Sequence, residues 1–442
     1  MEVQLDAPGG LRRQMTVRIP ADTVTKAVDD RLKRLSSRAR IPGFRPGKAP
    51  MKVIRQQYGE SARMEAVSEL VQQSYPEALT QAGVNPAGMP KIDVTAEKPG
   101  EPLEYVAAFE VYPEIQLADL SQLKVERPVV EITEADVDRL IDNLRKARRS
   151  FAVAERPAAT GDQVTIDFVG KLDGSPFDGG SAQGMTVELG AGRFLPDLEQ
   201  GIVGHSAGET FTVDVAFPED YRAEQLKGKT AQFEVTLHEV RAPQLPAIDD
   251  PGFLQAHGVE TVDTLRDKSR AALENERDKA IRNRVKAQVM EQLLVLNPVE
   301  VPDTLVQQEI PRLRVEAAGR MNMQQMPEDK LAEMLPASLF EANARRRVAL
   351  GLIVGEVVKQ REVKLQKDRL DAALEDLAAD YDEPEQVKSY YRGRKDLMQS
   401  LGAVVLEDTV VETLVAEATV TETAMSLEQL LSPPPPDTAR VA

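Results

Sequence analysis

The stretch Gly161-Asp162-Gln163-Val164-Thr165-Ile166-Asp167-Phe168-Val169-Gly170 decides the fold at the centre of this 442-residue chain. Its apolar and polar side chains alternate, which is the pattern of a half-buried β-strand. The same alternation returns at residues 211–215 and 233–237, and glycines separate these runs. Short alternating runs bounded by turn residues predict a compact antiparallel β domain, which we place at residues 151–244.

Residues 1–112 combine strand and helix patterns. Alternation at residues 12–19 and 103–112 predicts strands, and apolar stripes predict helices over about 22–40 and 51–82. A ten-residue loop with three prolines and two glycines lies between the helical segments and cannot continue a helix. We therefore expect an α+β N-terminal domain with a shaped loop between two helices.

The remaining segments are mainly helical. Residues 113–150 read as a linker with one helix, capped by Thr133. Residues 245–425 are predicted to form an extended all-α domain that begins with a helix of roughly 50 Å over 262–296. Ser338 and Glu341 have the spacing of a capping box for a later long helix. The proline-rich end, residues 426–442, is predicted to be disordered.

Composition excludes several classes of function. No apolar run approaches the length of a membrane span, and the first ten residues lack the pattern of a secretory signal, so we expect a cytoplasmic protein without membrane contacts. The chain has no cysteine, which removes disulfides and thiolate chemistry. Its three histidines lie far apart in the sequence. We therefore expect neither a metal nor a cofactor.

The charge is distributed unevenly. The net charge is −17, but residues 1–60 carry +7 and the rest of the chain −24. A basic head is the footprint expected for a partner that carries phosphates. The alternative is a solvated helix face, and charge alone favours this alternative.

Three ordered motifs in the central domain resemble FKBP-type prolyl isomerases. The first is the opening run with Asp173-Gly174-Ser175-Pro176-Phe177-Asp178-Gly179-Gly180. The second is Leu189-Gly190-Ala191-Gly192-Arg193-Phe194-Leu195-Pro196, continuing as Gly201-Ile202-Val203-Gly204, and the third joins residues 217–221 to 226–229. The blocks occur in family order over about 80 residues, so the resemblance is specific.

The resemblance implies an apolar pocket that isomerises Xaa-Pro bonds. Rotation about such a bond is opposed by amide resonance, and a site that desolvates the carbonyl and favours the twisted amide lowers the barrier without a nucleophile or metal. Asp178 would lie close to the substrate carbonyl. The other implied site residues are the wall residues Phe168, Phe177, Tyr221 and Phe233, the rim residues Met185 and Leu195, and Leu198 at the floor, where the family usually has an aromatic residue.

The loop between the N-terminal helices closely resembles the ribosome-docking loop of trigger factors. The matching residues are Gly43, Phe44, Arg45, Pro46, Gly47 and Lys48. By this resemblance Arg45 and Lys48 would contact rRNA phosphates or acidic side chains, and Phe44 would be an apolar anchor. Prolines stiffen the loop and lower the cost of ordering it on docking.

Residues 11–425 resemble trigger factors, including the segments 280–286 and 345–351. The resemblance implies an ATP-independent chaperone that docks on the large ribosomal subunit near the exit tunnel, through ribosomal protein and rRNA. It would shield nascent and unfolded polypeptides, isomerise prolyl bonds, and could form a homodimer off the ribosome. Two alternatives are a free-standing isomerase with a helical dimerisation scaffold, and a chaperone whose isomerase pocket is inactive.

Overall fold

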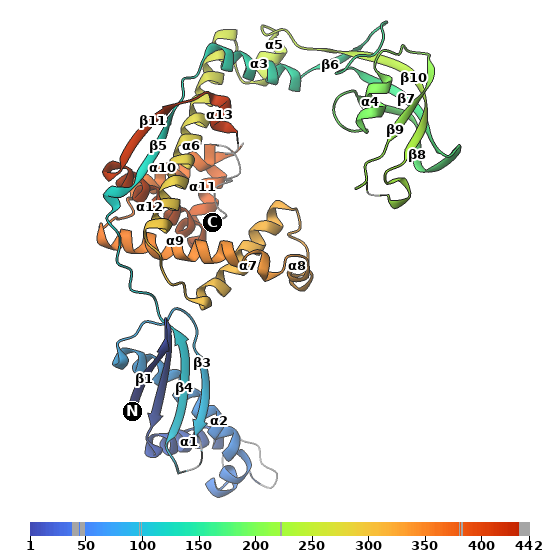
Figure 1. Ribbon diagram of the computed structural model, residues 1–442. Helices are drawn as coiled ribbons and strands as arrows, with labels where there is room; N and C mark the ends of the chain where they lie inside the picture. The colour runs from blue at the N-terminus through green and yellow to red at the C-terminus, as the bar shows by residue number, and fades with distance from the viewer. Residues whose placement is uncertain are drawn as a thin grey trace. The chain divides into compact units, whose positions relative to one another are not determined.

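The computed structural model describes residues 1–37, 44, 49–96, 98, 100–221, 223–379, 381 and 383–432. The chain divides into two compact units (Figure 1). One unit contains residues 1–127 and 283–422, and the other contains residues 128–282 with the segment from 423 onward. Of the predicted docking loop only Phe44 is described, and its side chain is exposed. Gly43, Arg45, Pro46, Gly47 and Lys48 lie outside the described residues.

The N-terminal domain is a four-stranded antiparallel sheet covered by two helices. The strand order is β1-β2-β4-β3, from β1 (Glu2–Gly9), β2 (Arg12–Ile19), β4 (Leu103–Glu110) and β3 (Lys91–Ala96). The helices are α1 (Ala21–Ser36) and α2 (Met51–Ala82), and α2 ends where Gly83 adopts the left-handed conformation. The strand at 12–19 and the helix at 51–82 were predicted at these bounds. The two edge strands were missed, because an exposed edge strand buries few apolar side chains.

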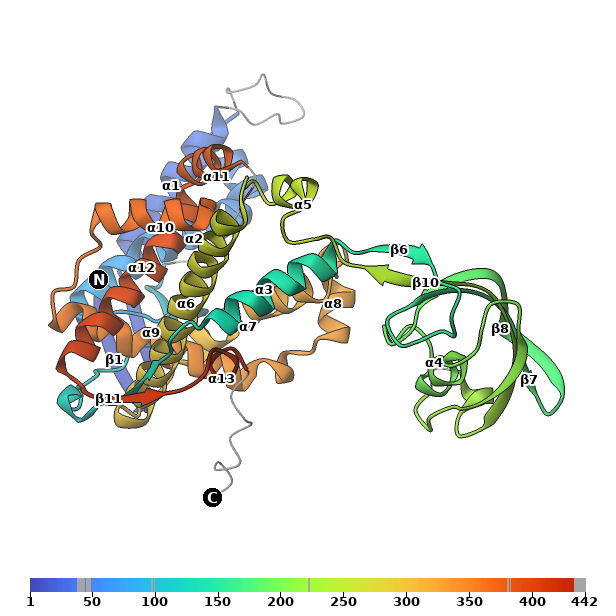
Figure 2. The same cartoon turned by 90° about the horizontal axis from the view of Figure 1, so that it is seen from above.

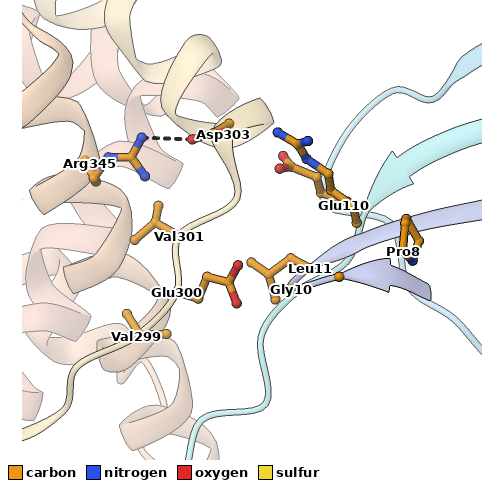
Figure 3. A pocket seen from close by; sticks show the side chains of 11 residues that line it. Pro8, Gly10, Leu11, Glu110, Val299, Glu300, Val301, Asp303 and Arg345 are labelled. Atoms are coloured by element: carbon orange, nitrogen blue, oxygen red, sulfur yellow. Dashed lines mark hydrogen bonds and ion pairs between the residues drawn. The ribbon is translucent and has the colours of Figure 1, made fainter.

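The tip of this sheet packs against the start of α7 (Asp303–Arg320) in the same unit (Figure 3). Glu110 Oε2 accepts hydrogen bonds from Thr304 N at 2.7 Å and from Thr304 Oγ1 at 2.8 Å. The residue at the N-cap position of α7 is Pro302, which offers no side-chain acceptor. Glu110 therefore caps α7 from a different domain. A cavity of about 610 Å³ lies beside this contact, and Glu300 and the Arg345–Asp303 ion pair line it.

A two-stranded sheet of β5 (Lys124–Val129) and β11 (Thr419–Ala424) lies along α6 (Val262–Leu296). Gln288 accepts from Glu126 N at 2.9 Å and donates to Glu126 O at 2.8 Å. Gln292 makes the same pair of bonds with the backbone of Lys124. The two side-chain amides, one helical turn apart, thus satisfy the free edge of β5 as another strand would.

The central β domain contains a five-stranded antiparallel sheet with one short helix against it (Figure 1). Its path runs β6-β10-β7-β8, with β9 paired to β10. The elements are β6 (Ser150–Val153), β7 (Gln163–Leu172), β8 (Ser175–Glu188), α4 (Pro196–Ile202), β9 (Thr210–Ala216) and β10 (Thr230–Gln244). Val164, Ile166 and Phe168 point into the core, as their alternation predicts.

The linker helix α3 (Glu134–Ala147) begins with the predicted cap. The Thr133 side chain accepts from Asp136 N, and the Asp136 carboxylate accepts from Thr133 N. Helix α3 shares a small core with α5 (Pro251–Ala256), the first part of α6, and α13 (Leu427–Leu431) (Figure 2). The tail from residue 426 was predicted to be disordered, but its first residues form α13. This helix is stable because Leu427 and Leu430 are buried in the shared core.

The helical domain continues through α7, α8 (Glu328–Met334), α9 (Glu341–Gln360), α10 (Lys367–Ala379), α11 (Pro384–Arg392) and α12 (Lys395–Glu417). The predicted helix at 262–296 is α6 at the same bounds. The predicted capping box of Ser338 and Glu341 is wrong. Residues 337–339 form a 3-10 turn and Phe340 takes the N-cap position, without a side-chain cap bond. In the described part of the chain no helix is long and apolar enough to cross a membrane.

We expect Glu110→Ala to loosen the start of α7. Removing a capping acceptor costs about 1 kcal/mol, so hydrogen exchange of the amides at residues 303–308 should rise roughly fivefold. Glu104→Ala is the matched control. It removes a carboxylate from the same strand, and this carboxylate bonds Arg18 and Thr95 instead of α7. Equal exchange rates at residues 303–308 in wild type and Glu110→Ala would contradict the capping role.

Candidate functional site

A continuous chain of aromatic rings lies in the central β domain. The ring centroids are 5.6 Å apart for Phe194 and Phe168, 5.9 Å for Phe168 and Phe233, and 6.0 Å for Phe233 and Phe177. The row of rings continues from Phe177 to Phe217, with centroids 6.3 Å apart, and from Phe217 to Tyr221, with centroids 4.7 Å apart. Most of these pairs meet edge to face, the arrangement that the ring quadrupole favours.

Two glycines make room for the ring of Phe177. A Cβ atom on Gly170 would lie 2.7 Å from a ring carbon of Phe233 and 2.9 Å from two ring carbons of Phe177. A Cβ on Gly180 would lie 2.6 Å from the Phe177 ring. Both distances are shorter than a Cβ atom tolerates, so a larger residue at either position would have to displace the ring. The ring therefore lies directly against the backbone of β7 and β8.

The rings surround a cavity of about 490 Å³. Among the residues implied by the sequence, those lining it are Phe168, Phe177, Asp178, Leu195, Leu198, Tyr221 and Phe233. Leu198 is buried on α4 beneath the cavity. Met185 packs against the same core but does not line the cavity. It lies on β8 opposite Ile166, beyond a bulge that separates it from the strand segment carrying Phe177.

Sequence reasoning missed several lining residues. Phe194 and Phe217 complete the aromatic chain, and Val215, Ala223 and Leu226 add apolar surface. Phe194 and Phe217 belong to the motifs that resemble FKBP-type isomerases, next to Leu195 and Pro218. The local sequence pattern did not predict that their side chains point into the cavity. Arg193 also lines the cavity, and its exposed side chain gave no periodic signal.

A buried carboxylate holds the loop that carries Phe194 and Leu195. Glu199 Oε2 accepts from Gly190 N at 2.8 Å, and Glu199 Oε1 accepts from Phe194 N at 3.1 Å. Glu199 is buried, and the hydrogen bonds from these two amides replace those that its carboxyl group would make to water. The side chain thereby fixes both ends of the loop at residues 190–194. Glu199 is a positioning residue that the sequence pattern did not single out.

A second carboxylate anchors the entry to β7. Asp162 is buried and forms a bidentate pair with Arg156 at 2.6 and 2.8 Å, and it also accepts from Ala159 N at 2.9 Å. Burial alone would raise the pKa of Asp162. The Arg156 guanidinium and the amide outweigh burial and leave the pKa below its usual value. The group is therefore ionised at neutral pH and stabilises the turn before β7.

The side chains that line the site suit the binding of an apolar segment. Its described lining residues are aromatic, aliphatic or glycine, except for Asp178 and Arg193, whose side chains are charged. Such a surface can strip water from a prolyl amide and pack on the proline ring. Asp178 is exposed on β8 directly after Phe177, at the edge of the cavity.

Comparisons with known families match most of the chain. The model described as bacterial trigger factor protein matches residues 1–144, and that of the trigger factor C-terminus matches residues 261–416. The model described as FKBP-type peptidyl-prolyl cis-trans isomerase matches residues 154–238.

Curated relatives extend over nearly the whole length. The trigger factor of Thioalkalivibrio sulfidiphilus (strain HL-EbGR7) is 44% identical over 435 residues, and the alignment covers 98% of each chain. That of Pseudomonas putida (strain W619) is 45% identical with the same coverage. A solved trigger factor chaperone structure, described for promiscuous substrate recognition, covers 94% of this chain and 100% of its own, with 20% identity and a TM-score of 0.48.

The central sheet, its aromatic cavity and the match over residues 154–238 define an FKBP-type peptidyl-prolyl isomerase domain. The segments before and after this domain match trigger factor models and show to which family the whole chain belongs. The chain belongs to the bacterial trigger factor family, the ribosome-associated chaperones with an FKBP-type isomerase domain. This confirms the predicted three-domain fold class. A free-standing isomerase is not supported, since the trigger factor matches continue on both sides of the domain.

We expect Glu199→Gln to lower both the stability and the isomerase activity of the protein. An amide can accept only one of the two N–H bonds with the same geometry, so about 1–3 kcal/mol of stability is lost. The loosened loop displaces Phe194 and Leu195, which should lower kcat/KM for a proline tetrapeptide about tenfold. Asp197→Asn is the control, since this exposed side chain on the same helix bonds only Ala216 N. A wild-type rate in folded Glu199→Gln would refute the positioning role.

Proposed function

We propose that the aromatic cavity is the isomerase active site of this chain. A prolyl side chain would insert among Phe168, Phe177 and Phe233, with Leu198 as the floor and Tyr221 and Leu195 at the edge. The support is the continuous ring contacts and the largely aromatic and aliphatic side chains that line the cavity. Catalysis would come from desolvation and from better packing on the twisted amide than on either planar isomer.

Asp178 has a distinct role in this proposal. It is a charged side chain on the cavity edge next to Phe177. Amide resonance places partial positive charge on the nitrogen and partial negative charge on the carbonyl oxygen. A carboxylate near the carbonyl repels the negative charge on the oxygen, so it favours the twisted amide, in which resonance is weaker. Met185 would act indirectly, through its packing against the domain core.

The family binds ribosomes and nascent chains, and we propose the contacts that this chain uses. The loop residues Gly43, Phe44, Arg45, Pro46, Gly47 and Lys48 would dock on the large subunit near the exit tunnel, against ribosomal protein and rRNA. Phe44 supports this, because 41% of this aromatic side chain is exposed. An exposed aromatic beside two cations is typical of an interface anchor.

The helical domain would hold client segments. Large apolar side chains are exposed on its helices and turns, namely Val295, Val315, Met321, Met334 and Leu339. Scattered apolar groups with flexible methionines suit clients of many sequences. Within this proposal the functional parts are residues 1–112 for docking, 151–244 for isomerisation and 245–425 for clients, and the protein is cytoplasmic. A homodimer off the ribosome is part of the same proposal.

Co-sedimentation with bacterial ribosomes tests the docking loop. We expect the Phe44→Ala, Arg45→Ala, Lys48→Ala triple variant to bind at least about tenfold more weakly than wild type, because it loses an apolar anchor and two phosphate or carboxylate contacts. The matched control is Arg12→Ala with Arg13→Ala, which removes the same charge from the basic head at the start of β2.

Three outcomes separate the possibilities. Loss of binding in the triple variant alone supports the loop. Equal loss in both variants means that the charge of the basic head acts as a whole, and the loop assignment fails. Equal binding of the triple variant and wild type places the ribosome contact elsewhere.

A further inference from the structure

Among the described residues that line the isomerase cavity, the two charged ones lie apart along the chain of ring contacts. Arg193 precedes Phe194 in the loop before α4, and Asp178 follows Phe177 on β8. In the aromatic chain Phe194 and Phe177 are separated by Phe168 and Phe233. A positive and a negative side chain therefore border one cavity, each next to a ring, and the two rings are three contacts apart in this chain.

Neither charge is neutralised within the described part of the protein. By contrast, three other arginines in or next to this domain have acidic partners: Arg149 pairs with Glu188, Arg156 with Asp162, and Arg241 with Glu239. Arg193 is exposed, and no ion pair or hydrogen bond joins it to a described residue; the same holds for the Asp178 carboxylate. Both groups are thus available to a bound peptide.

The loop that carries Arg193 is held in place by Glu199 of α4. Glu199 fixes the amides of Gly190 and Phe194 on either side of it, and the Phe194 ring packs edge-on against Phe168. The backbone of Arg193 is therefore preorganised, and only its side chain must be ordered when a peptide binds.

We propose that Arg193 is a specificity-determining residue, which selects proline segments carrying an acidic side chain next to the prolyl bond. This proposal rests on the cavity being the isomerase site. The guanidinium would pair with a client carboxylate on one side of the proline, while Asp178 disfavours an acid on the other side. The body of the protein is strongly acidic, so Arg193 offsets a repulsion that acidic clients otherwise meet.

Isomerisation rates of two peptide series test the proposal. One series varies the residue before proline and the other varies the residue after it, with Glu, Gln and Lys in each. Exposed ion pairs contribute up to about 1 kcal/mol, so in one series wild type should favour Glu over Lys about two- to fivefold in kcat/KM. Raising the ionic strength to about 1 M should shrink that preference.

Charge reversal gives the decisive comparison. In Arg193→Glu the Glu-to-Lys ratio should invert in the same series. Lys171→Glu is the matched control, because it makes the same charge change on the β7–β8 hairpin, away from the described cavity lining. Among the described residues, Lys171 forms its ion pair with Glu234 at the surface. It should keep the wild-type ratio.

Each outcome has a defined meaning. Inversion in Arg193→Glu with retention in Lys171→Glu supports the assignment. An unchanged ratio in folded Arg193→Glu, or the same change in both variants, overturns it while leaving the isomerase intact. If wild type accelerates none of the peptides, including those with Gln, the cavity is not an isomerase site and the role of Arg193 fails with it.

Discussion

The contact between the Phe177 ring and the backbone of Gly170 and Gly180 is the constraint on which the isomerase site depends. Any side chain at either glycine would occupy the place of the ring, since an added Cβ would lie 2.6–2.9 Å from its carbons. With Phe177 in this position, Phe233 and Phe217 can pack edge-on against it, and the cavity acquires its wall. The apolar volume is thus built into the sheet itself and does not depend on a mobile loop.

The opposite wall depends on buried charge. Glu199 uses both carboxylate oxygens to hold the loop at residues 190–194, and this loop carries Phe194, Leu195 and Arg193. One wall is therefore fixed by steric exclusion and the other by hydrogen bonds. Such rigidity suits a prolyl isomerase, because part of its catalysis comes from fitting the twisted amide better than the planar one.

The sequence predicted elements wherever an apolar period was strong. The bounds of α2, α6 and β2 follow from long stripes or clean alternation, whereas β1 and β3 are edge strands with little burial and were missed. Local caps were less certain: Thr133 caps α3 as its spacing implies, but Ser338 does not cap α9, because a 3-10 turn intervenes. Seven of the described cavity residues could be named from ordered motifs, among them the three rings of Phe168, Phe177 and Phe233. Glu199 and Arg193 could not, since their roles arise from contacts between β8, α4 and the loop joining them.

Isomerase kinetics of Gly170→Ala tests the central claim most directly. The account predicts that the protein stays folded, because accommodating the methyl group costs about 1–3 kcal/mol. The Phe177 and Phe233 rings must shift to admit it, so kcat/KM for a proline tetrapeptide should fall by about tenfold or more, while Ser181→Ala on the exposed side of β8 keeps the wild-type rate. A Gly170→Ala protein that is folded by circular dichroism and isomerises the peptide at the wild-type rate would contradict the account.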